Sequence, residues 1–324
     1  MAPTFDYVSL DHIDLEDKTF IVTYRPDMRA LDHSVARMGV LTPLHLRRRP
    51  ESDRLQVVCG SKRLQASQNA GHPRVPALIY DTAELADAQA FRLAMYDNLG
   101  CRPLNGVEKG RILKQLRDDF HYDVTVLVQD VCPLLDLPPR PDTLTTYCTL
   151  VTLDEPLQAA TVEATLSLET ALWVGQHPPE DRQVLLALFT GLSLGRNRAR
   201  EFATTIEDLC RRDACRPAQL LQDLEVLEIL HAAQLNGPQK VERVRHVLRQ
   251  ARYPSFSVHE QHFHQTLRQL GLPSQVHLRP PPYFEGQQYQ ISFDFHSRQE
   301  LRQIAQRLIE AAANDAMDDL LSLL

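Results

Sequence analysis

The chain has 324 residues, of which 43% are hydrophobic and 24% charged, and its formal net charge is −7. This length suits two or three domains with buried cores. The acidic balance excludes a uniformly basic nucleic-acid-binding protein, so any anion-binding region must be local. No uncharged apolar run approaches the roughly 18 residues of a membrane span, and the N-terminus lacks the apolar core of a signal peptide. We expect a cytoplasmic protein with no membrane contact.

The six cysteines fit neither a disulfide framework nor a zinc site. They stand at Cys59, Cys101, Cys132, Cys148, Cys210 and Cys215. No two of them form a Cys-x-x-Cys pair, and Cys210 and Cys215, with four residues between them, are too few ligands for zinc. Reduced thiols throughout are the expectation for a cytosolic protein.

The first 120 residues alternate between short strands and helices. Residues 4–25 are predicted to be extended and partly β. Strands are predicted over Leu44–Arg47, Leu55–Cys59 and Val75–Tyr80, and helices over Met28–Met38, 61–70, 82–97 and 105–120. Gly39 is expected to end the first helix and Ser61 to cap the second. This alternation indicates an α+β domain.

The remainder changes character twice. From residue 106 to 253 the pattern is almost wholly helical, interrupted by prolines. The tail then predicts strands over Gln275–Leu278 and Gln288–Phe295 and a final helix from Ser297 to the C-terminus. We therefore predict three domains, over residues 1–104, 105–253 and 254–324. The apolar stripe of the last helix is more often typical of a core contact within the chain, and dimerisation through the third domain is the alternative.

The turn after the second strand has the character of a phosphate site. A strand ends at Cys59, Gly60 makes the turn, and a helix follows. Exposed N–H groups and the helix dipole favour an anion at such a point. Lys62 and Arg63 lie in the first helical turn, where cations oppose the dipole. A bound phosphate would explain them, and two solvated surface bases are the alternative.

Five motifs in order resemble the N-terminal nucleotide-binding domain of ParB-type DNA partition proteins, in the ParB/sulfiredoxin-like superfamily. They are Ser34-Val35, Gly39-Val40-Leu41-Thr42-Pro43, Gly60-Ser61-Lys62-Arg63-Leu64-Gln65-Ala66, Asp97-Asn98-Leu99 and Leu104-Asn105-Gly106-Val107-Glu108. The resemblance covers residues 5–120 and continues more weakly to about 210. It implies an α+β ParB-like domain and then a mainly helical region with a helix-turn-helix. The small α/β C-terminal element is predicted from its own residue pattern, and it does not match the C-terminus of the family.

The resemblance also implies a CTP site with Mg²⁺. By resemblance, Gly60, Ser61, Lys62 and Arg63 bind the phosphates. Asp97 takes the metal, and Asn98 orients phosphate or metal-bound water. Hard oxygen ligands suit Mg²⁺, and paired bases suit phosphate.

Five departures from the family pattern argue against hydrolysis. Ser61 replaces a Glu, Lys62 replaces an Arg, and Asp97 is a shorter carboxylate than the usual Glu. The Gln-Pro-Arg triplet of members that hydrolyse CTP is absent from the matching region, residues 17–20, and the Arg that follows the Glu-Asn pair is displaced to Arg102. We expect a binding protein with weak or no hydrolysis, and no catalytic residue is assigned.

The predicted helix-turn-helix spans residues 124–151. Its candidate DNA contacts are Arg140, Thr143, Thr145 and Thr146. Between Asp118 and Asp181 the sequence has twelve acids and one base, Arg140. DNA affinity depends largely on Lys and Arg, so this charge disfavours DNA locally. A basic cluster around Arg196–Arg216 offers an alternative contact with phosphates, or an ordinary solvated surface.

Three functions remain open from the sequence. The first is a ParB-like, CTP-binding clamp or adaptor in DNA partition or transcriptional regulation, acting as a homodimer. The second is a diverged adaptor that binds protein through the acidic helical region, without DNA. The third is a small-molecule phosphotransferase on the same fold.

Overall fold

The computed structural model describes residues 3–281 and 288–322, apart from the side chains of residues 255–258, 260 and 261. It separates into two compact units, residues 1–178 and 179–324. The three domains predicted over residues 1–104, 105–253 and 254–324 stay a prediction. No helix among the described residues is long and apolar enough to cross a membrane.

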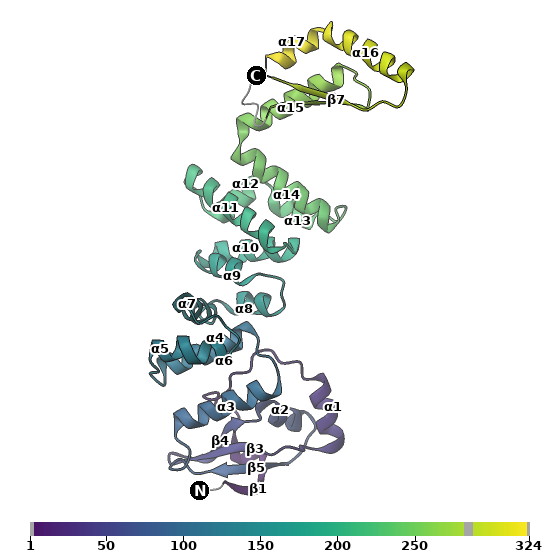
Figure 1. The fold of residues 1–324 in the computed structure, drawn as a ribbon. Coiled ribbons are helices and arrows are strands. Elements are labelled where there is room, and N and C mark those ends of the chain that lie inside the picture. Colours follow the sequence, from purple (N-terminus) through teal and green to yellow (C-terminus); the bar gives the residue numbers. More distant parts are fainter. Residues whose placement is uncertain (1–2, 282–287, 323–324) are drawn as a thin grey trace. The chain divides into compact units, whose positions relative to one another are not determined.

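The first unit opens with a mixed sheet and its helices. The elements are β1 (Thr4–Ser9), the 3-10 helix η1 (Leu10–His12), β2 (Ile13–Asp14), α1 (Arg29–Met38), β3 (Leu44–Arg49), β4 (Ser52–Cys59), α2 (Ser61–Asn69), β5 (Arg74–Tyr80) and α3 (Asp87–Cys101). The strands are ordered β1-β5-β3-β4-β2, with β3 parallel to β5 and antiparallel to β4. Helices α2 and α3 lie over one face of this sheet (Figure 1). The predicted α+β domain is confirmed.

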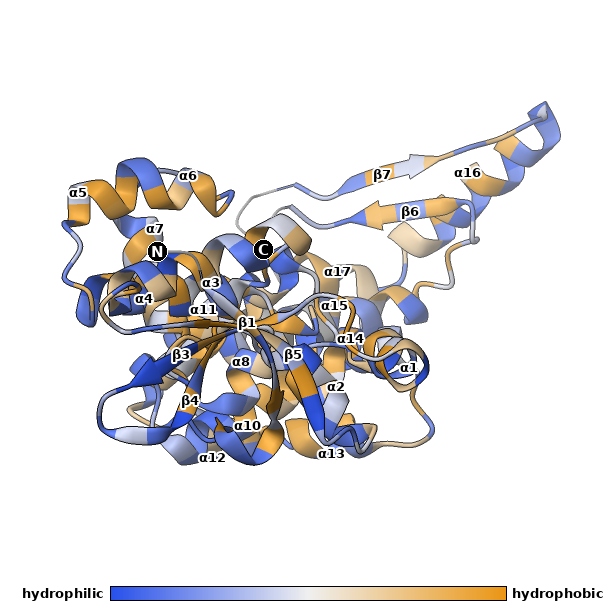
Figure 2. Ribbon diagram, turned by 90° about the horizontal axis from the view of Figure 1, so that it is seen from below, coloured by the Kyte–Doolittle hydropathy of each residue, from blue (hydrophilic) through white to orange (hydrophobic). Residues whose placement is uncertain are grey.

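The sheet is held together by apolar side chains between the strands and the helices. Leu44, Leu46, Val75 and Ala77 are fully buried in one cluster with Leu64 of α2. Figure 2 shows β3 changing from apolar to hydrophilic towards its end, where Arg47–Arg49 follow Leu46. The polar end of this strand builds the network described below.

A helical region completes the first unit. Its elements are α4 (Gly106–Asp118), α5 (Val124–Val126), the π-helix η2 (Leu127–Val131), α6 (Cys132–Leu134), α7 (Pro141–Leu150), α8 (Glu155–Val162) and α9 (Leu168–Gly175). Helix α4 packs closely on α7. A Cβ added at Gly110 would lie 2.4 Å from the carbonyl oxygen of Tyr147, so only glycine permits this approach. The mainly helical character predicted for this region is confirmed.

The second unit is helical and ends in a small α/β element. It comprises α10 (Pro179–Leu192), α11 (Arg196–Asp213), α12 (Pro217–Asp223), α13 (Val226–His231), α14 (Gly237–Arg252), α15 (Pro254–Gln269), β6 (Val276–Arg279), β7 (Gln290–Phe293), α16 (Arg298–Ala312) and α17 (Asp315–Leu321). Strands β6 and β7 pair antiparallel. The α/β character predicted for the tail is confirmed.

Three details of the predicted elements are wrong. Ser61 does not cap α2, because Gly60 occupies the cap position and Ser61 is already helical. Helix α3 starts at Asp87 and not near residue 82, and it runs past Asp97 to Cys101. The final helix is two helices, because the Asn314 side chain accepts a hydrogen bond from the Ala316 N–H and starts α17 as a new helix.

Candidate nucleotide-binding site

The turn between β4 and α2 is shaped by Gly60. Its φ of +95° is a left-handed conformation that favours glycine. A Cβ here would also lie 3.1 Å from Leu44 Cγ and 3.3 Å from the Arg63 guanidinium. Because Gly60 has no side chain, none caps the first N–H groups of α2. The turn therefore offers backbone donors to an anion.

Arg63 holds this turn to its neighbours. Its Nη1 donates to the carbonyl oxygens of Thr42 and Pro43, at 2.7 and 2.9 Å. Its Nη2 lies 3.7 Å from Oδ2 of Asp97. The predicted phosphate ligand Arg63 is thus engaged with the Thr42–Pro43 step and with α3.

Lys62 points to the other side of the turn, towards Arg102 and Glu108. Burial, then the positive charge of Arg102, lower the pKa of the Lys62 ammonium. Among the described residues Lys62 forms no ion pair. Its charge is therefore partly desolvated and not neutralised, which makes an anionic ligand favourable beside it.

Ser61 and Lys62 line a pocket of about 870 Å³ in the first unit. The rest of the lining comes from the segment 14–26, from α2 and from α4, with Val151 and Gln158. Five basic side chains are among the lining residues: Lys18, Arg25, Lys62, Arg111 and Lys114. The acidic ones are Asp14, Asp17 and Asp119. A pocket of this size and charge suits a small anion with a polar body.

Two of these five cations are already paired. Arg25 forms ion pairs with Glu155 at 3.4 Å and Glu163 at 2.5 Å, and Lys114 pairs with Asp118 at 2.7 Å. Lys18, Lys62 and Arg111 have no ion pair within the part of the chain that the structure describes. The free charge of the pocket thus comes from these three residues.

Arg111 is fixed in place by α4 and the N-terminal segment. Its Nη1 donates to the Thr23 carbonyl at 3.0 Å, and its guanidinium lies 4.8 Å from the centre of the Tyr24 ring. A guanidinium held flat on a ring keeps several N–H donors available to a phosphate.

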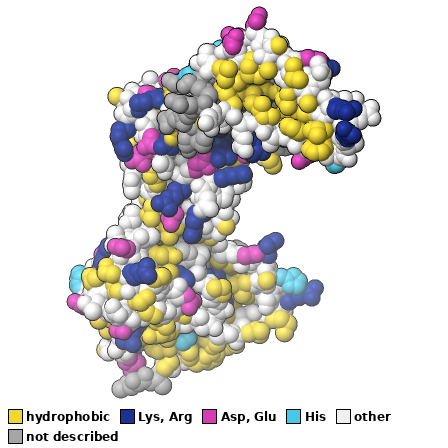
Figure 3. Space-filling view, turned by 45° about the horizontal axis from the view of Figure 1, so that its top comes forward, with side chains coloured by type: hydrophobic (Ala, Val, Ile, Leu, Met, Phe, Trp, Pro, Cys, Tyr) yellow, Lys and Arg dark blue, Asp and Glu magenta, His cyan; other side chains and the backbone are white. Residues whose placement is uncertain are grey.

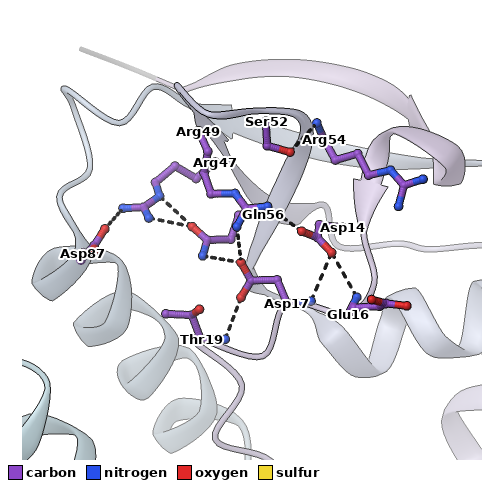
Figure 4. A network of polar contacts seen from close by, with 10 residues as sticks. All are labelled: Asp14, Glu16, Asp17, Thr19, Arg47, Arg49, Ser52, Arg54, Gln56 and Asp87. Atoms are coloured by element: carbon purple, nitrogen blue, oxygen red, sulfur yellow. Dashed lines mark hydrogen bonds and ion pairs between the residues drawn. The ribbon is translucent and has the colours of Figure 1, made fainter.

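Two of the three acidic side chains of the pocket, Asp14 and Asp17, belong to a polar network shown in Figure 4. Arg49 pairs with Asp14 at 2.5 Å and Asp17 at 2.8 Å. Gln56 joins Asp17 to the buried Arg47, whose Nη1 reaches Asp87 at 2.6 Å. Arg49 offsets one of the two negative charges of Asp14 and Asp17, so this group opposes an anion in the pocket less than two free carboxylates would.

Arg102 and Glu108 form a second polar group beside Lys62. The two pair bidentately, with both N···O distances 2.6 Å, and Glu108 is 1% exposed. Glu108 also accepts the backbone N–H groups of Tyr24 and Asn105, the latter closing a capping box at the start of α4. The displaced Arg102 of the sequence is thus bound to a buried carboxylate.

The predicted metal residues lie within α3, outside the pocket lining. Asp97 faces Arg63, and the Asn98 side chain donates to the Ala94 carbonyl at 2.9 Å. No cluster of three or more His, Cys, Asp or Glu that could hold a metal is found among the described residues. One carboxylate fits a Mg²⁺ held chiefly by nucleotide phosphates and water, and it does not fit an all-protein site.

The structure thus divides the predicted site residues. Ser61 and Lys62 enter the pocket, and Gly60 and Arg63 form the adjoining turn. Asp97 faces Arg63 from α3, and Asn98 contacts its own helix. The sequence analysis missed Lys18, Arg25, Arg111 and Lys114. Arg111 and Lys114 stand three residues apart on α4, and this i, i+3 spacing could have indicated a shared basic face.

The predicted helix-turn-helix corresponds to two helical stretches. Residues 124–134 are helical across α5, η2 and α6, and α7 covers Pro141–Leu150. Arg140 and Thr145 are exposed, and Thr143 and Thr146 are partly so. The Thr145 hydroxyl donates to the Pro141 carbonyl at 3.2 Å. DNA recognition by this pair stays a prediction.

Residues 8–99 match the family model of the ParB N-terminal domain. The chromosome-partitioning protein ParB of Myxococcus xanthus is 37% identical over 93 residues, which cover 29% of this chain and 30% of the relative. The probable chromosome 1-partitioning protein ParB of Deinococcus radiodurans is 32% identical over 160 residues, 49% of this chain and 51% of the relative. The chain thus matches at most about half the length of these relatives.

Among solved structures, a C-terminally truncated ParB from Caulobacter crescentus complexed with CTP-gamma-S is similar with a TM-score of 0.28 and 21% identity. The match covers 57% of this chain and 98% of the Caulobacter crescentus chain.

The first part of the chain, residues 8–99, is therefore a ParB N-terminal domain, and the predicted resemblance is confirmed. Both curated relatives are chromosome-partitioning proteins. They give no support to the expectation that the acidic stretch disfavours DNA.

Proposed function

We propose that this chain is a ParB-like partition or regulatory protein that binds CTP with Mg²⁺ in the pocket beside Lys62. The observation that carries the proposal is a pocket of about 870 Å³ next to an uncapped helix start, with three unpaired cations, Lys18, Lys62 and Arg111. A triphosphate neutralises these three cations, and its oxygens accept hydrogen bonds from the free N–H groups of the turn. The resemblance of this turn to the ParB motif supports CTP as the nucleotide.

Arg63 and Asp97 act at the edge of this site. When the phosphates bind, the Arg63 guanidinium exchanges its contact with Asp97 for a phosphate oxygen, and Asp97 becomes available to Mg²⁺. The 3.7 Å separation of Arg63 and Asp97 is long for an ion pair, so this exchange loses little. Asn98 then orients phosphate or metal-bound water after its side chain gives up the hydrogen bond to the Ala94 carbonyl.

The protein binds nucleotide and hydrolyses it weakly or not at all. Ser61 stands where the family motif has a carboxylate. The three lining carboxylates are Asp14, Asp17 and Asp119, and the first two are held by Arg49. A general base must be free to accept a proton from water, and neither Asp14 nor Asp17 meets this condition.

The partner roles follow from the relatives. We propose that the chain acts as a clamp or adaptor on DNA and forms a homodimer through its C-terminal element. Figure 3 shows an apolar area over that element. In the C-terminal element as a whole, Ile291, Phe295 and Ile309 are 45%, 49% and 65% exposed. An exposed apolar area is typical of a protein interface.

Calorimetric titration with CTP, ATP and GTP, each with and without Mg²⁺, tests the proposal. We expect CTP binding that Mg²⁺ strengthens. The Lys62→Ala/Arg63→Ala double variant should lose it, while Lys109→Ala, on α4 but outside the pocket lining, should retain it. Absence of binding for all three nucleotides would exclude this function. A double variant that binds CTP as the wild type does would show that the phosphates bind elsewhere.

One observation favours a second function, an adaptor that binds protein without DNA. Residues 118–178 contain ten Asp or Glu and a single Arg. Such a surface suits a basic protein partner. Retention on duplex DNA at increasing salt separates the two functions, because the adaptor shows none at moderate ionic strength.

A further inference from the structure

Helix α11 in the second unit ends in a motif that brings two cysteines together. Ala214 follows the helix with φ +51°, a left-handed conformation that reverses the chain. The N–H of Cys215 then donates to the carbonyl of Cys210 at 3.1 Å. This six-residue bond defines a Schellman motif, in which the side chains of the first and last residues characteristically touch. Here both of those residues are cysteines.

The Schellman bond places the two cysteines beside each other at the end of α11. Both side chains are partly exposed. By contrast, Cys59, Cys132 and Cys148 are buried, and Cys101 is exposed. Burial, then the neighbouring Cys215, raise the pKa of the Cys210 thiol to about 12. Cys210 therefore keeps its proton at neutral pH.

The surroundings of the pair are fixed on both sides. Arg216, the next residue, pairs with the buried Asp181 at 3.1 Å and with Glu180 at 2.9 Å. Arg212 pairs with Asp213 at 2.7 Å and donates to the Ala251 carbonyl at 2.8 Å. The backbone between the two sulfurs is thus anchored, so the thiols meet in the folded chain without further ordering.

We propose that Cys210 and Cys215 are a site of oxidative modification, where a peroxide forms an intrachain disulfide. The Cys215 sulfur attacks a peroxide oxygen, the O–O bond breaks, and Cys215 becomes a sulfenic acid as the alcohol or water leaves. The Cys210 sulfur then attacks the Cys215 sulfur and displaces hydroxide, which leaves as water with the proton of Cys210. Two thiols lose two electrons and one peroxide gains them.

The site is tested by treating the folded, full-length protein with a rising series of hydrogen peroxide concentrations. Tryptic cleavage after Arg211 and Arg212 separates the two cysteines, so their disulfide appears as two linked peptides under non-reducing conditions. We expect this linked pair as the first oxidation product, a loss of two hydrogens in the intact mass, and full reversal by dithiothreitol. Oxidation at Cys101 alone, with Cys210 and Cys215 still alkylated by iodoacetamide, would overturn the proposal.

Two variants and one unfolding control sharpen the test. Cys215→Ser, or Cys210→Ser if the first does not fold, should abolish the linked pair, and Cys101→Ser should leave it unchanged. The disulfide should also form at least several-fold faster in the folded protein than in urea. Equal rates would mean that sequence proximity alone, and not the Schellman motif, brings the thiols together, and this would also overturn the proposal.

Discussion

The pocket beside Lys62 and the helical stretch that follows it carry opposite charges within one unit. The pocket is lined by five basic and three acidic residues, whereas residues 118–178 have ten acids and one base. Helix α4 separates the two, with Arg111 and Lys114 towards the pocket and Gly110 against α7. A net charge of −7 thus conceals a local anion site, and anion binding must be argued from individual side chains.

Removing the buried charge of α4 should have the largest effect. In Glu108→Ala, Arg102 and two backbone N–H groups lose their acceptor, and we expect a loss of about 3–5 kcal/mol in the free energy of unfolding, as measured by urea denaturation. Glu51→Ala, an exposed position, is the matched control. If Glu108→Ala lost less unfolding free energy than the control, the Arg102–Glu108 pair would contribute nothing to stability.

The same carboxylate predicts a pH dependence. Burial raises the pKa of Glu108, but the bonds from Arg102, Tyr24 and Asn105 outweigh it and leave the pKa below the ordinary value of 4.5 for a glutamate. The stabilisation is therefore present above that pH and is lost as the pH falls through the lowered pKa. Wild type and Glu108→Gln should differ most at neutral pH and converge in acid.

The second-largest effect should distinguish the pocket from the acidic stretch by their influence on nucleotide binding. Arg111→Ala should weaken CTP binding by about 10- to 100-fold, because a charge-assisted bond to phosphate contributes about 1.5–3 kcal/mol. Arg140→Ala, in the acidic stretch, should leave nucleotide affinity unchanged. Calorimetry measures both. Equal losses in the two variants would mean that the nucleotide is attracted by overall charge and not by this pocket.

The close contact between α4 and α7 should tolerate no side chain at Gly110. In Gly110→Ala the new Cβ would lie 2.4 Å from the Tyr147 carbonyl oxygen, which is backbone, and we expect a loss of about 1–3 kcal/mol in thermal or urea unfolding. Gly175→Ala is the comparison, since its Cβ meets only the Leu153 side-chain terminus at 2.3 Å. Equal costs would show that α7 moves away from α4 readily.

The smallest effect concerns DNA. If α7 contacts a duplex, Arg140 is the single base of this region available to a phosphate. Arg140→Ala should then lower the slope of log affinity against log salt by about one unit. An unchanged slope would place the DNA contact outside the acidic stretch.

Most of the first domain was predictable from local patterns. Short strands predicted from the sequence correspond to β3, β4 and β5, and the helix predicted over residues 105–120 corresponds to α4. The cap of α2 was predicted wrongly because a Ser after a Gly resembles an N-cap, whereas the left-handed Gly60 already starts the helix. The sequence predicted that helix α3 starts at residue 82, because the Thr82–Glu84 segment resembles the acidic first turn of a helix. The helix in fact starts at Asp87.

The candidate site was predictable only in part. Ser61 and Lys62 follow from a local turn motif. The pocket also needs Lys18 and Arg111, which are far apart in sequence and meet only after folding. The contact of Arg63 with Thr42, Pro43 and Asp97 likewise depends on three separate elements. Long-range contacts between polar side chains leave no periodic signal in a single sequence.

The tether of Arg63 has a consequence for binding kinetics. With its guanidinium fixed on the Thr42 and Pro43 carbonyls, the Gly60 turn holds its conformation before any ligand arrives. A nucleotide therefore meets a preorganised cradle and need not order a loop, which lowers the entropic cost of association. Capture should proceed at a rate set by diffusion and electrostatic attraction, and affinity should be adjusted mainly through the rate of release.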